Sequence, residues 1–427
     1  MPAFVIADIA ANPNGSSVGV QTKPGLEKMK NGSDDDESIW HSLDIRSSSA
    51  MGCVMSTAIA VLLCKHRCSI ERLTSSMSFH PPSPPSYSFE GTEDGSLKLV
   101  FAHHDMAAAL LHMGRQRKVR CELKLLRTSR RQSIPLFHFI CEGARMTVLW
   151  SHANAMDCGE MYFFFIELAA RLNVNVAAYD YSGYGAATGQ PTESNAYSDA
   201  RAAFDYLVST GIDAETQIIL YGQSIGSAPT LYLATKRKYA AVILHTPILS
   251  GLRFLIPPPP GLCTWQGCCS PRCVYAPCDP FPNFKRIRRV SAPVLLIHGT
   301  ADRTVHYSHS LTLYERLPPQ HRREPYIIEG AGHENIVDYD VDGYFRRVQA
   351  FLSDVSSLSS NGRSTSDSAY PMASRTATVA SAPLTRARGD GIDLHTVNMH
   401  PSCESEESAG KGGCNTGAPP TALHMQR

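Results

Sequence analysis

The chain has 427 residues and a formal net charge of +1, and 43% of its residues are hydrophobic and 8% aromatic. These values are ordinary for a globular protein, and a nearly neutral chain has no electrostatic footprint for nucleic acid. Its 13 cysteines, an odd number spread along the sequence, are unlike the framework of a secreted disulfide-bonded domain. Residues 1–15 lack a basic leader and no run of about 18 apolar residues occurs, so we expect neither a signal peptide nor a membrane-spanning helix, and a reducing, cytosolic environment.

Residues 1–50 are rich in Asn, Gly, Ser and Asp, a composition that predicts a disordered N-terminal extension. The next six residues, Met-Gly-Cys-Val-Met-Ser from Met51, fit the pattern for N-myristoylation. Gly52 is an acceptor only if translation begins at Met51, because an internal glycine has no free amino group. The sequence leaves both Met1 and Met51 open as the start.

Three cysteines mark the segment 51–77, which we predict to be a lipid anchor. Cys53, Cys64 and Cys68 flank a short apolar run and lie near basic residues, as S-acylated cysteines do. Two lipid signals are what stable membrane attachment needs. The alternative is an amphipathic helix that docks on the core without a lipid.

Residues 80–87 contain four prolines, which predict an extended linker, and residues 90–113 show no clear pattern. Apolar and charged residues alternate over Val119–Leu125, and Leu136–Cys141 is the expected antiparallel partner of this strand. Eight basic residues against one acid between Arg115 and Arg131 indicate a charged strand edge in solvent, with a surface for anionic lipid headgroups as the alternative.

From Met146 onward, apolar strands alternate with helical patterns. This alternation predicts βαβ units, and hence a mostly parallel central sheet with helices on both faces and an antiparallel N-terminal hairpin. Catalytic groups are then expected on loops at the C-terminal ends of the strands. The expected strands are 147–150, 174–179, 217–221, 241–244, 293–297 and 326–328, and the expected helices are 158–172, 194–208, 227–236, 307–317 and 341–354.

The third of these strands leads directly into Gly222-Gln223-Ser224-Ile225-Gly226 and a helical run. Strand, sharp turn and helix with a serine at the apex are the layout of a nucleophile elbow, which predicts Ser224 as a nucleophile. The two glycines have a steric reason, because a Cβ at either position would collide with neighbouring backbone. The alternative is a glycine-rich turn with an idle serine.

A serine nucleophile needs a histidine base and an acid that orients it, and in this layout they follow in the order serine, acid, histidine. Asp302 follows the strand 293–297 and His333 follows the strand 326–328, so both are expected at the edge that holds Ser224. The alternative for Asp302 is a turn cap. His298 lies on the strand end itself and is expected to be structural.

The oxyanion hole is expected to use backbone N–H groups. One is that of Ile225, directly after the nucleophile, and the second is that of Ala153 or Asn154 in the loop after the strand 147–150. Side chains are expected to matter little there, because the backbone donates.

Two further segments surround or interrupt this pattern. Residues 356–427 lose all periodicity and fill with Ser, Thr, Ala and Gly, which predicts a disordered tail. Residues 252–279 are a cysteine-rich insert whose irregular spacing favours an ordinary loop with reduced thiols and no metal, while zinc ligation and acylation of a membrane-facing cap are the alternatives. Its cysteines are Cys263, Cys268, Cys269, Cys273 and Cys278.

Four stretches, Asp180–Gly185, Tyr221–Gly226, Val242–His245 and Glu329–His333, closely resemble the alpha/beta-hydrolase domain-containing protein 17 family. The resemblance covers residues 78–355, includes Pro-Pro-Ser-Tyr at 84–87, and implies an alpha/beta-hydrolase fold. The sequence departs from the family at residue 153, where alanine replaces the glycine of a His-Gly-Asn-Ala loop. We therefore expect either strain or a backbone without positive φ at this residue.

Members of this family are membrane-anchored serine hydrolases that remove palmitate from cysteines of other proteins. The resemblance implies Ser224, Asp302 and His333 as the triad, no cofactor, and S-acylated membrane proteins as substrates. It also implies a lipid-anchored location on the cytoplasmic face of membranes such as the plasma membrane or endosomes, and we expect a monomer with no nucleic-acid partner. The alternatives are a carboxylesterase or lipase for small or lipid esters, a serine aminopeptidase, and a catalytically silent fold that binds a ligand or partner.

Overall fold

The computed structural model describes residues 69–91, 97–102, 110, 112–255 and 279–364, all within the unit Leu63–Arg427. The candidate lipid sites Gly52, Cys53, Cys64 and Cys68 lie outside the described residues, as do the extension 1–50, the five cysteines of the insert and positions 365–427. No helix in the described ranges combines the length and apolar character needed to cross a bilayer.

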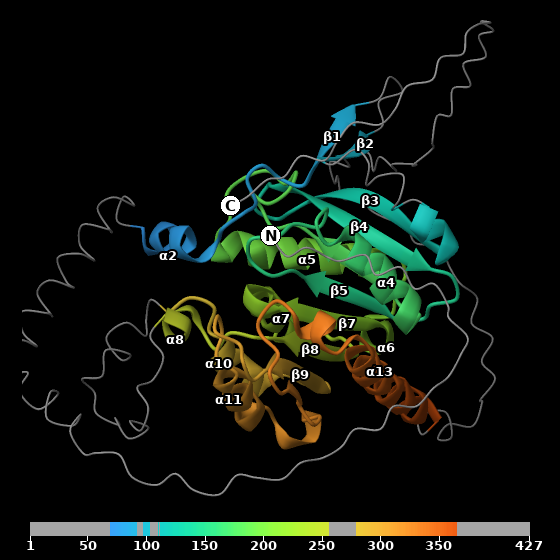
Figure 1. Ribbon diagram of the computed structural model, residues 1–427, viewed down its shortest axis with the longest axis vertical. Coiled ribbons are helices and arrows are strands. Elements are labelled where there is room, and N and C mark those ends of the chain that lie inside the picture. Colours follow the sequence, from blue (N-terminus) through green and yellow to red (C-terminus); the bar gives the residue numbers. More distant parts are fainter. Residues whose placement is uncertain (1–68, 92–96, 103–109, 111, 256–278, 365–427) are drawn as a thin grey trace, which may run out of the picture. The chain divides into compact units, whose positions relative to one another are not determined.

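A central sheet organises the domain (Figure 1). Its strands are β3 (Val119–Arg127), β4 (Ser133–Cys141), β5 (Thr147–Ser151), β6 (Asn175–Tyr179), β7 (Ile218–Gln223), β8 (Ala241–His245), β9 (Val294–Gly299) and β10 (Tyr326–Ile328). Their spatial order is β10-β9-β8-β7-β5-β6-β4-β3. The pairs β3–β4 and β4–β6 are antiparallel and the other pairs are parallel, which confirms the predicted sheet and its N-terminal hairpin.

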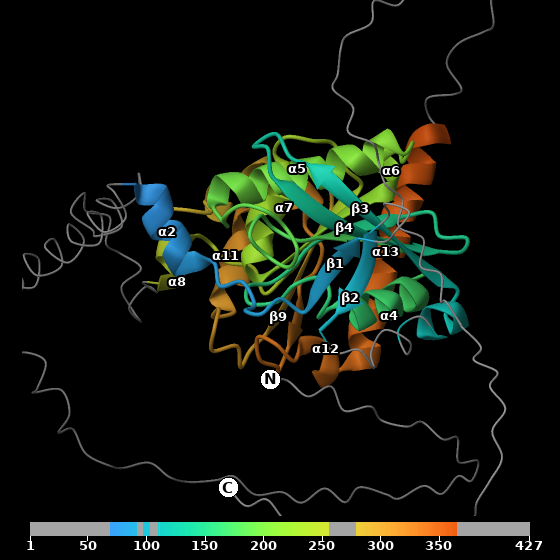
Figure 2. The same cartoon turned by 90° about the horizontal axis from the view of Figure 1, so that it is seen from above.

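Helices cover both faces of this sheet (Figure 2). Because side chains alternate along a strand, Tyr221 of β7 faces one layer of helices and Leu220 faces the other. The first layer contains α4 (Tyr162–Leu172) and α13 (Val341–Ser364), and the second contains α5 (Glu193–Ser209), α7 (Ser227–Ala234) and α11 (Ser308–Arg316). The shorter helices are α6 (Ala214–Gln217), α8 (Gly251–Leu255), α10 (Asn283–Arg286) and α12 (Ile336–Tyr339), with 3₁₀ turns η1 (Ser224–Gly226), η3 (Ile287–Arg289) and η4 (Pro319–His321).

The C-terminal helix α13 continues to Ser364, past the predicted end of the domain at residue 355. Phe351, Leu352 and Val355 are buried and hold the preceding turns against the sheet. A helix that packing has already nucleated extends at little cost, even through serine-rich sequence. The helix therefore runs past residue 355, and the domain boundary there stays a prediction.

The N-terminal side of the domain differs most from the sequence-based expectations. Strands β1 (Tyr87–Gly91) and β2 (Leu97–Phe101) form a two-stranded antiparallel sheet in the region without a clear pattern. Helix α2 (Ile70–Ser78) lies before the predicted domain start at residue 78. The proline-rich stretch after α2 contains neither helix nor strand up to residue 86, and it is fixed at both ends because Phe79 and Tyr87 are buried.

Candidate active site

Ser224 lies at the turn between β7 and α7. Its φ of 52° is in the left-handed region, which costs a serine about 1–2 kcal/mol. The turn is so tight that a Cβ on Gly222 would lie 2.7 Å from the carbonyl oxygen of Gly226, and a Cβ on Gly226 would lie 2.1 Å from that of Ser151. The predicted steric reason for both glycines is confirmed, and the left-handed backbone of Ser224 is strained.

Three side chains from three different loops meet at the carboxyl edge of the sheet. His333 Nε2 lies 3.0 Å from Ser224 Oγ, and His333 Nδ1 lies 2.7 Å from Asp302 Oδ2. Because a carboxylate only accepts hydrogen bonds, His333 Nδ1–H donates to Asp302, which leaves Nε2 to accept the hydroxyl of Ser224. Asp302 follows β9 and His333 follows β10, so the structure brings together the three residues that the sequence placed at the strand ends.

The carboxylate of Asp302 is held at both oxygens. Oδ1 accepts the backbone N–H groups of Thr304 and Val305, each at 2.8 Å, and Oδ2 faces His333 and His298. Burial alone would raise the pKa of Asp302, but the hydrogen bonds from the two histidines outweigh it and hold the pKa well below its usual range. The side chain is therefore ionised at neutral pH and available to stabilise a protonated His333.

His298, which we expected to be structural, is fully buried and contacts the acid directly. Its Nε2 lies 3.0 Å from Asp302 Oδ2 and 2.8 Å from the carbonyl oxygen of Val305. Because both neighbours are acceptors, Nε2 carries the proton, and Nδ1 accepts from the hydroxyl of Ser310 at 2.7 Å. Its hydrogen bond to Asp302 makes this histidine part of the site.

The loop after β5 packs directly against the nucleophile turn. A Cβ on Gly226 would lie 2.7 Å from the carbonyl oxygen of His152 as well as 2.1 Å from that of Ser151. The turn that carries Ile225 is therefore in contact with the loop that continues into residues 153 and 154. This arrangement fits the predicted oxyanion hole, and the choice between Ala153 and Asn154 as the second donor stays a prediction.

The departure from the family sequence at residue 153 does not produce strain there. Ala153 does not have a positive φ, whereas Ala155 has φ 57°. The expectation of a backbone without positive φ at residue 153 is therefore the correct one, and the left-handed residue of this loop lies two positions later.

Buried groups, among them Tyr181 and Asp180, also contact His152 in the loop after β5. The His152 ring lies 4.1 Å from the Tyr181 ring between centroids, and the Tyr181 hydroxyl donates to the His152 carbonyl at 2.6 Å. His152 Nδ1 lies 2.7 Å from the Ala153 carbonyl oxygen, so Nδ1–H donates. Burial lowers the pKa of His152 to about 4, so the ring is neutral at pH 7 although its Nε2 lies 3.4 Å from Asp180 Oδ1.

Comparison with known proteins places the chain in a family. It is 39% identical over 284 residues to alpha/beta hydrolase domain-containing protein 17B of Homo sapiens, an alignment that covers 66% of this chain and 91% of the human protein. The chain belongs to the alpha/beta-hydrolase domain-containing protein 17 family. A second relative in this comparison, aho-3 of Caenorhabditis elegans, is 37% identical over 288 residues, with 66% of this chain and 77% of the nematode protein covered.

The chain also matches a model of a protein family and several solved structures. The model of the prolyl oligopeptidase family matches residues 166–358. Among solved structures, an esterase from Pyrococcus furiosus is similar with a TM-score of 0.44 and 17% identity, over 56% of this chain and 93% of the esterase. A putative hydrolase from Agrobacterium vitis is similar with a TM-score of 0.41 and 22% identity, over 55% and 99% of the two chains. The sheet order, the family model and the curated relatives together identify the chain as an alpha/beta hydrolase.

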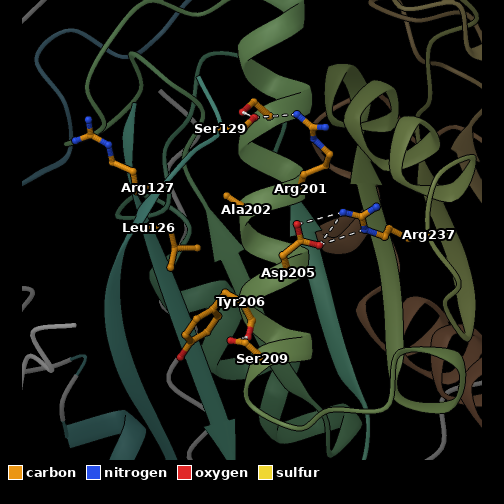
Figure 3. A pocket seen from close by; sticks show the side chains of 10 residues that line it. Leu126, Arg127, Ser129, Arg201, Ala202, Asp205, Tyr206, Ser209 and Arg237 are labelled. Carbon is orange, nitrogen blue, oxygen red and sulfur yellow. Dashed lines mark hydrogen bonds and ion pairs between the residues drawn. The ribbon is translucent and has the colours of Figure 1, made fainter. Parts of the chain in front are cut away.

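Other candidate sites on this alpha/beta hydrolase are less informative. Within the described part of the chain, no three His, Cys, Asp or Glu side chains group as metal ligands would. A cavity of about 350 Å³ lies along α5. Figure 3 shows the side chains that line it, among which Arg237 pairs with Asp205 and Arg201 donates to Ser129. None of the three predicted catalytic residues lines this cavity, and we assign it no part in catalysis.

Two contributions to the site were missed at the sequence level. One is the hydrogen bond of His298 to Asp302, and the other is the side chain of Asn154, which makes several hydrogen bonds described below. The position of a histidine at the end of a strand does not by itself indicate whether its ring packs in the core or contacts the catalytic acid. No sequence signal identifies the partners of Asn154, because two of them lie more than 70 residues earlier in the chain and the third, Tyr184, lies 30 residues later.

Proposed function

We propose that this protein is a serine hydrolase that removes long-chain acyl groups, palmitate among them, from the cysteines of S-acylated membrane proteins. The observation that carries the proposal is the hydrogen-bonded series Ser224, His333 and Asp302 at the carboxyl edge of the sheet. The acyl-thioester class is supported by the resemblance of the sequence to a family of protein depalmitoylases.

In the first half of the reaction, His333 Nε2 takes the hydroxyl proton of Ser224 while Oγ forms a bond to the thioester carbonyl carbon. Asp302 stays ionised and stabilises the resulting imidazolium through Nδ1–H. The backbone N–H groups of Ile225 and of the 153–154 loop donate to the oxyanion of the tetrahedral intermediate. The C–S bond then breaks, and the cysteine sulfur leaves with the proton from His333.

In the second half, a water molecule attacks the acyl-serine ester. His333 takes a proton from the water and returns it to Ser224 Oγ as the ester C–O bond breaks, which releases the fatty acid. A thiol has a pKa near 8.5, far below that of an alcohol, so protonation of the first leaving group is undemanding. The same residues also fit oxyester cleavage, and the choice between the two substrate classes requires a direct measurement.

Membrane attachment gives a physical reason for the substrate class. We propose that Gly52, if Met51 is the start, and Cys53, Cys64 and Cys68 carry lipids that hold the enzyme on the cytoplasmic face of membranes. A lipidated enzyme and an acylated protein on one surface meet at high effective concentration. Metabolic labelling with a myristate or palmitate analogue tests this, and a chain without label at any of these four residues would exclude lipid anchoring through them.

The test of the hydrolase proposal uses the purified full chain with a fluorophosphonate probe and with a palmitoyl thioester and its matched oxyester. We expect labelling and thioester turnover by the natural chain, and loss of both in Ser224→Ala and of turnover in His333→Ala. Ser209→Ala, at an exposed serine of α5, is the matched control and keeps full labelling. Labelling that persists in Ser224→Ala would remove the nucleophile, and faster turnover of the oxyester would make the protein a carboxylesterase.

A further inference from the structure

The side chain of Asn154, beside the predicted oxyanion donors, is held by the chain just after α2. Its Nδ2 donates to the carbonyl oxygen of Ser78 at 2.7 Å and lies 3.1 Å from His80 Nδ1. Its Oδ1 accepts the backbone N–H of His80 at 2.9 Å. Both ends of the amide are therefore engaged by residues that precede it by 74 and 76 positions.

A buried tyrosine closes this set of hydrogen bonds. The hydroxyl of Tyr184 donates to Asn154 Oδ1 at 2.6 Å and accepts the backbone N–H of His80 at 3.0 Å. Tyr184 is fully buried, and its ring packs edge-on against Phe79 with 6.3 Å between centroids. The hydroxyl thus fixes Asn154 and His80 relative to each other.

The segment Ser69–His80, which we call the docked segment, is attached to the core at two further points. Phe79 is buried with its ring edge-on to Tyr181 and Phe281, at centroid distances of 6.5 and 5.7 Å. At the start of α2, Glu71 accepts the backbone N–H of Ser194 in the first turn of α5. Figures 1 and 2 both show α2 beside this end of α5.

From these contacts we propose that the docked segment positions the oxyanion loop through the side chain of Asn154, so that full turnover requires the segment in place. This inference rests on the proposed function. Asn154 is then a positioning residue through its amide, which overturns the expectation that side chains matter little in this loop. Because Cys64 and Cys68 lie directly upstream of Ser69 in the sequence, the docked segment also connects the candidate lipid sites to the oxyanion loop.

The predicted effect falls on turnover and not on substrate binding. An N–H in an oxyanion hole contributes mainly to the tetrahedral intermediate, so a small displacement lowers kcat and leaves KM nearly unchanged. For hydrolysis of p-nitrophenyl butyrate by the full chain, we expect Asn154→Ala to lower kcat at least about tenfold, with KM within about threefold. Tyr184→Phe, which keeps the buried ring and removes the hydroxyl, lowers kcat about threefold to fivefold by the same reasoning.

A second set of measurements separates positioning from a general loss of structure. Affinity for a trifluoromethyl ketone, which forms a tetrahedral adduct with the serine, falls in parallel with kcat across the variants. Phe79→Ala lowers kcat. The double variant Phe79→Ala with Asn154→Ala has a kcat within about twofold of that of Asn154→Ala alone, because both changes break the same connection between the docked segment and the oxyanion loop. Tyr239→Phe, which also removes one buried tyrosine hydroxyl but just before β8 at the amino edge of the sheet, keeps kcat.

The results distinguish failure of the positioning role of the docked segment from failure of the proposed hydrolase function. If Asn154→Ala and Tyr184→Phe keep kcat within twofold of the natural chain, or if the effects of Phe79→Ala and Asn154→Ala on the activation free energy simply add, the docked segment does not position the loop. Ser224→Ala is measured in the same series. If it turns over ester like the natural chain, the proposed function fails instead, whereas an inactive Ser224→Ala beside a fully active Asn154→Ala overturns this inference alone.

Discussion

His298 and Asp302 are joined by a buried hydrogen bond of 3.0 Å, from Nε2 to the same carboxylate oxygen, Oδ2, that His333 contacts at 2.7 Å. One oxygen of the acid therefore lies between two histidines, one in the core and one beside the nucleophile. The buried histidine is itself fixed by Ser310, whose hydroxyl lies 2.7 Å from Nδ1. The orientation of the carboxylate toward His333 thus depends on a residue that does not touch the nucleophile.

Replacing His298 by alanine is expected to lower kcat by about tenfold with little change in KM. The backbone N–H groups of Thr304 and Val305 still hold Oδ1, but Oδ2 loses one of its two donors and its orientation. Steady-state kinetics on a soluble ester measures the effect. His298→Gln, whose Nε2 reaches a similar position, restores part of the activity, and equal rates for the alanine variant and the natural chain would show that His298 only fills space.

Gly226→Ala is expected to destabilise the fold by about 3 kcal/mol and to lower activity by at least two orders of magnitude. The added Cβ lies 2.1 Å from the carbonyl oxygen of Ser151, and relief requires the loop after β5 to move away from Ser224. Urea unfolding and ester hydrolysis measure the two effects. Gly91→Ala, where a Cβ meets nothing within 4 Å, is the matched control, and a fully active, stable Gly226→Ala would contradict the crowding at this turn.

Glycine at residues 153 and 155 should have opposite effects on stability. Ala155 has φ 57°, so Ala155→Gly relieves strain and raises the free energy of unfolding by up to about 1 kcal/mol. Ala153 has no positive φ and is buried, so Ala153→Gly adds freedom to the unfolded chain and removes a buried methyl group. It lowers the free energy of unfolding by about 1–2 kcal/mol. Chemical denaturation of both variants tests this, and stabilisation by glycine at 153 would mean that the strain lies there after all.

The sheet and the triad were predictable because the information lies in short stretches of sequence. Ser224, Asp302 and His333 each follow directly after an apolar strand, and the ends of parallel strands share one edge. Local alternation was enough to place them together, although 109 residues separate Ser224 from His333. The β2 strand was not predicted, because Lys98 is its one polar residue and the stretch shows no clear alternation.

The contacts that support the triad were not predictable in the same way. Asn154 meets His80, and Tyr184 meets His80 across 104 residues, through hydrogen bonds that depend on where a proline-rich segment runs over the folded domain. No periodicity encodes such a path. The insert at 252–279 and the lipid sites near Cys53 stay predictions, because the described residues do not include them, apart from the ends of the insert.

Burial lowers the pKa of four buried histidines in the described structure. The values are about 4 for His138, His152 and His309 and about 3 for His245. In the unfolded chain these groups titrate near 6.5. Between about pH 6.5 and pH 4 the unfolded chain therefore binds protons that the folded chain does not, so each histidine makes the fold less stable as the pH falls.

Two buried carboxylates act in the opposite direction. Burial raises the pKa of Asp180 and of Asp199 to about 7. Below this pH the folded chain binds a proton at each group, whereas an unfolded aspartate stays ionised until about pH 4. Between these limits the two aspartates stabilise the fold as the pH falls. The destabilising effect of the four histidines is larger, because they bind more protons in the unfolded chain than the two aspartates bind in the folded chain.

The net prediction is acid destabilisation between pH 6 and pH 5, by roughly 2 kcal/mol per pH unit, since about two more protons bind to the unfolded chain. The free energy of urea unfolding, measured at several pH values in this range, tests it. His138→Leu should make the dependence shallower by about one proton, because it removes one buried histidine whose Nε2 has no hydrogen-bond partner in the described structure. An unfolding free energy that is constant over this range, or unchanged pH dependence in the leucine variant, would contradict the assignment of these histidines as neutral in the folded protein.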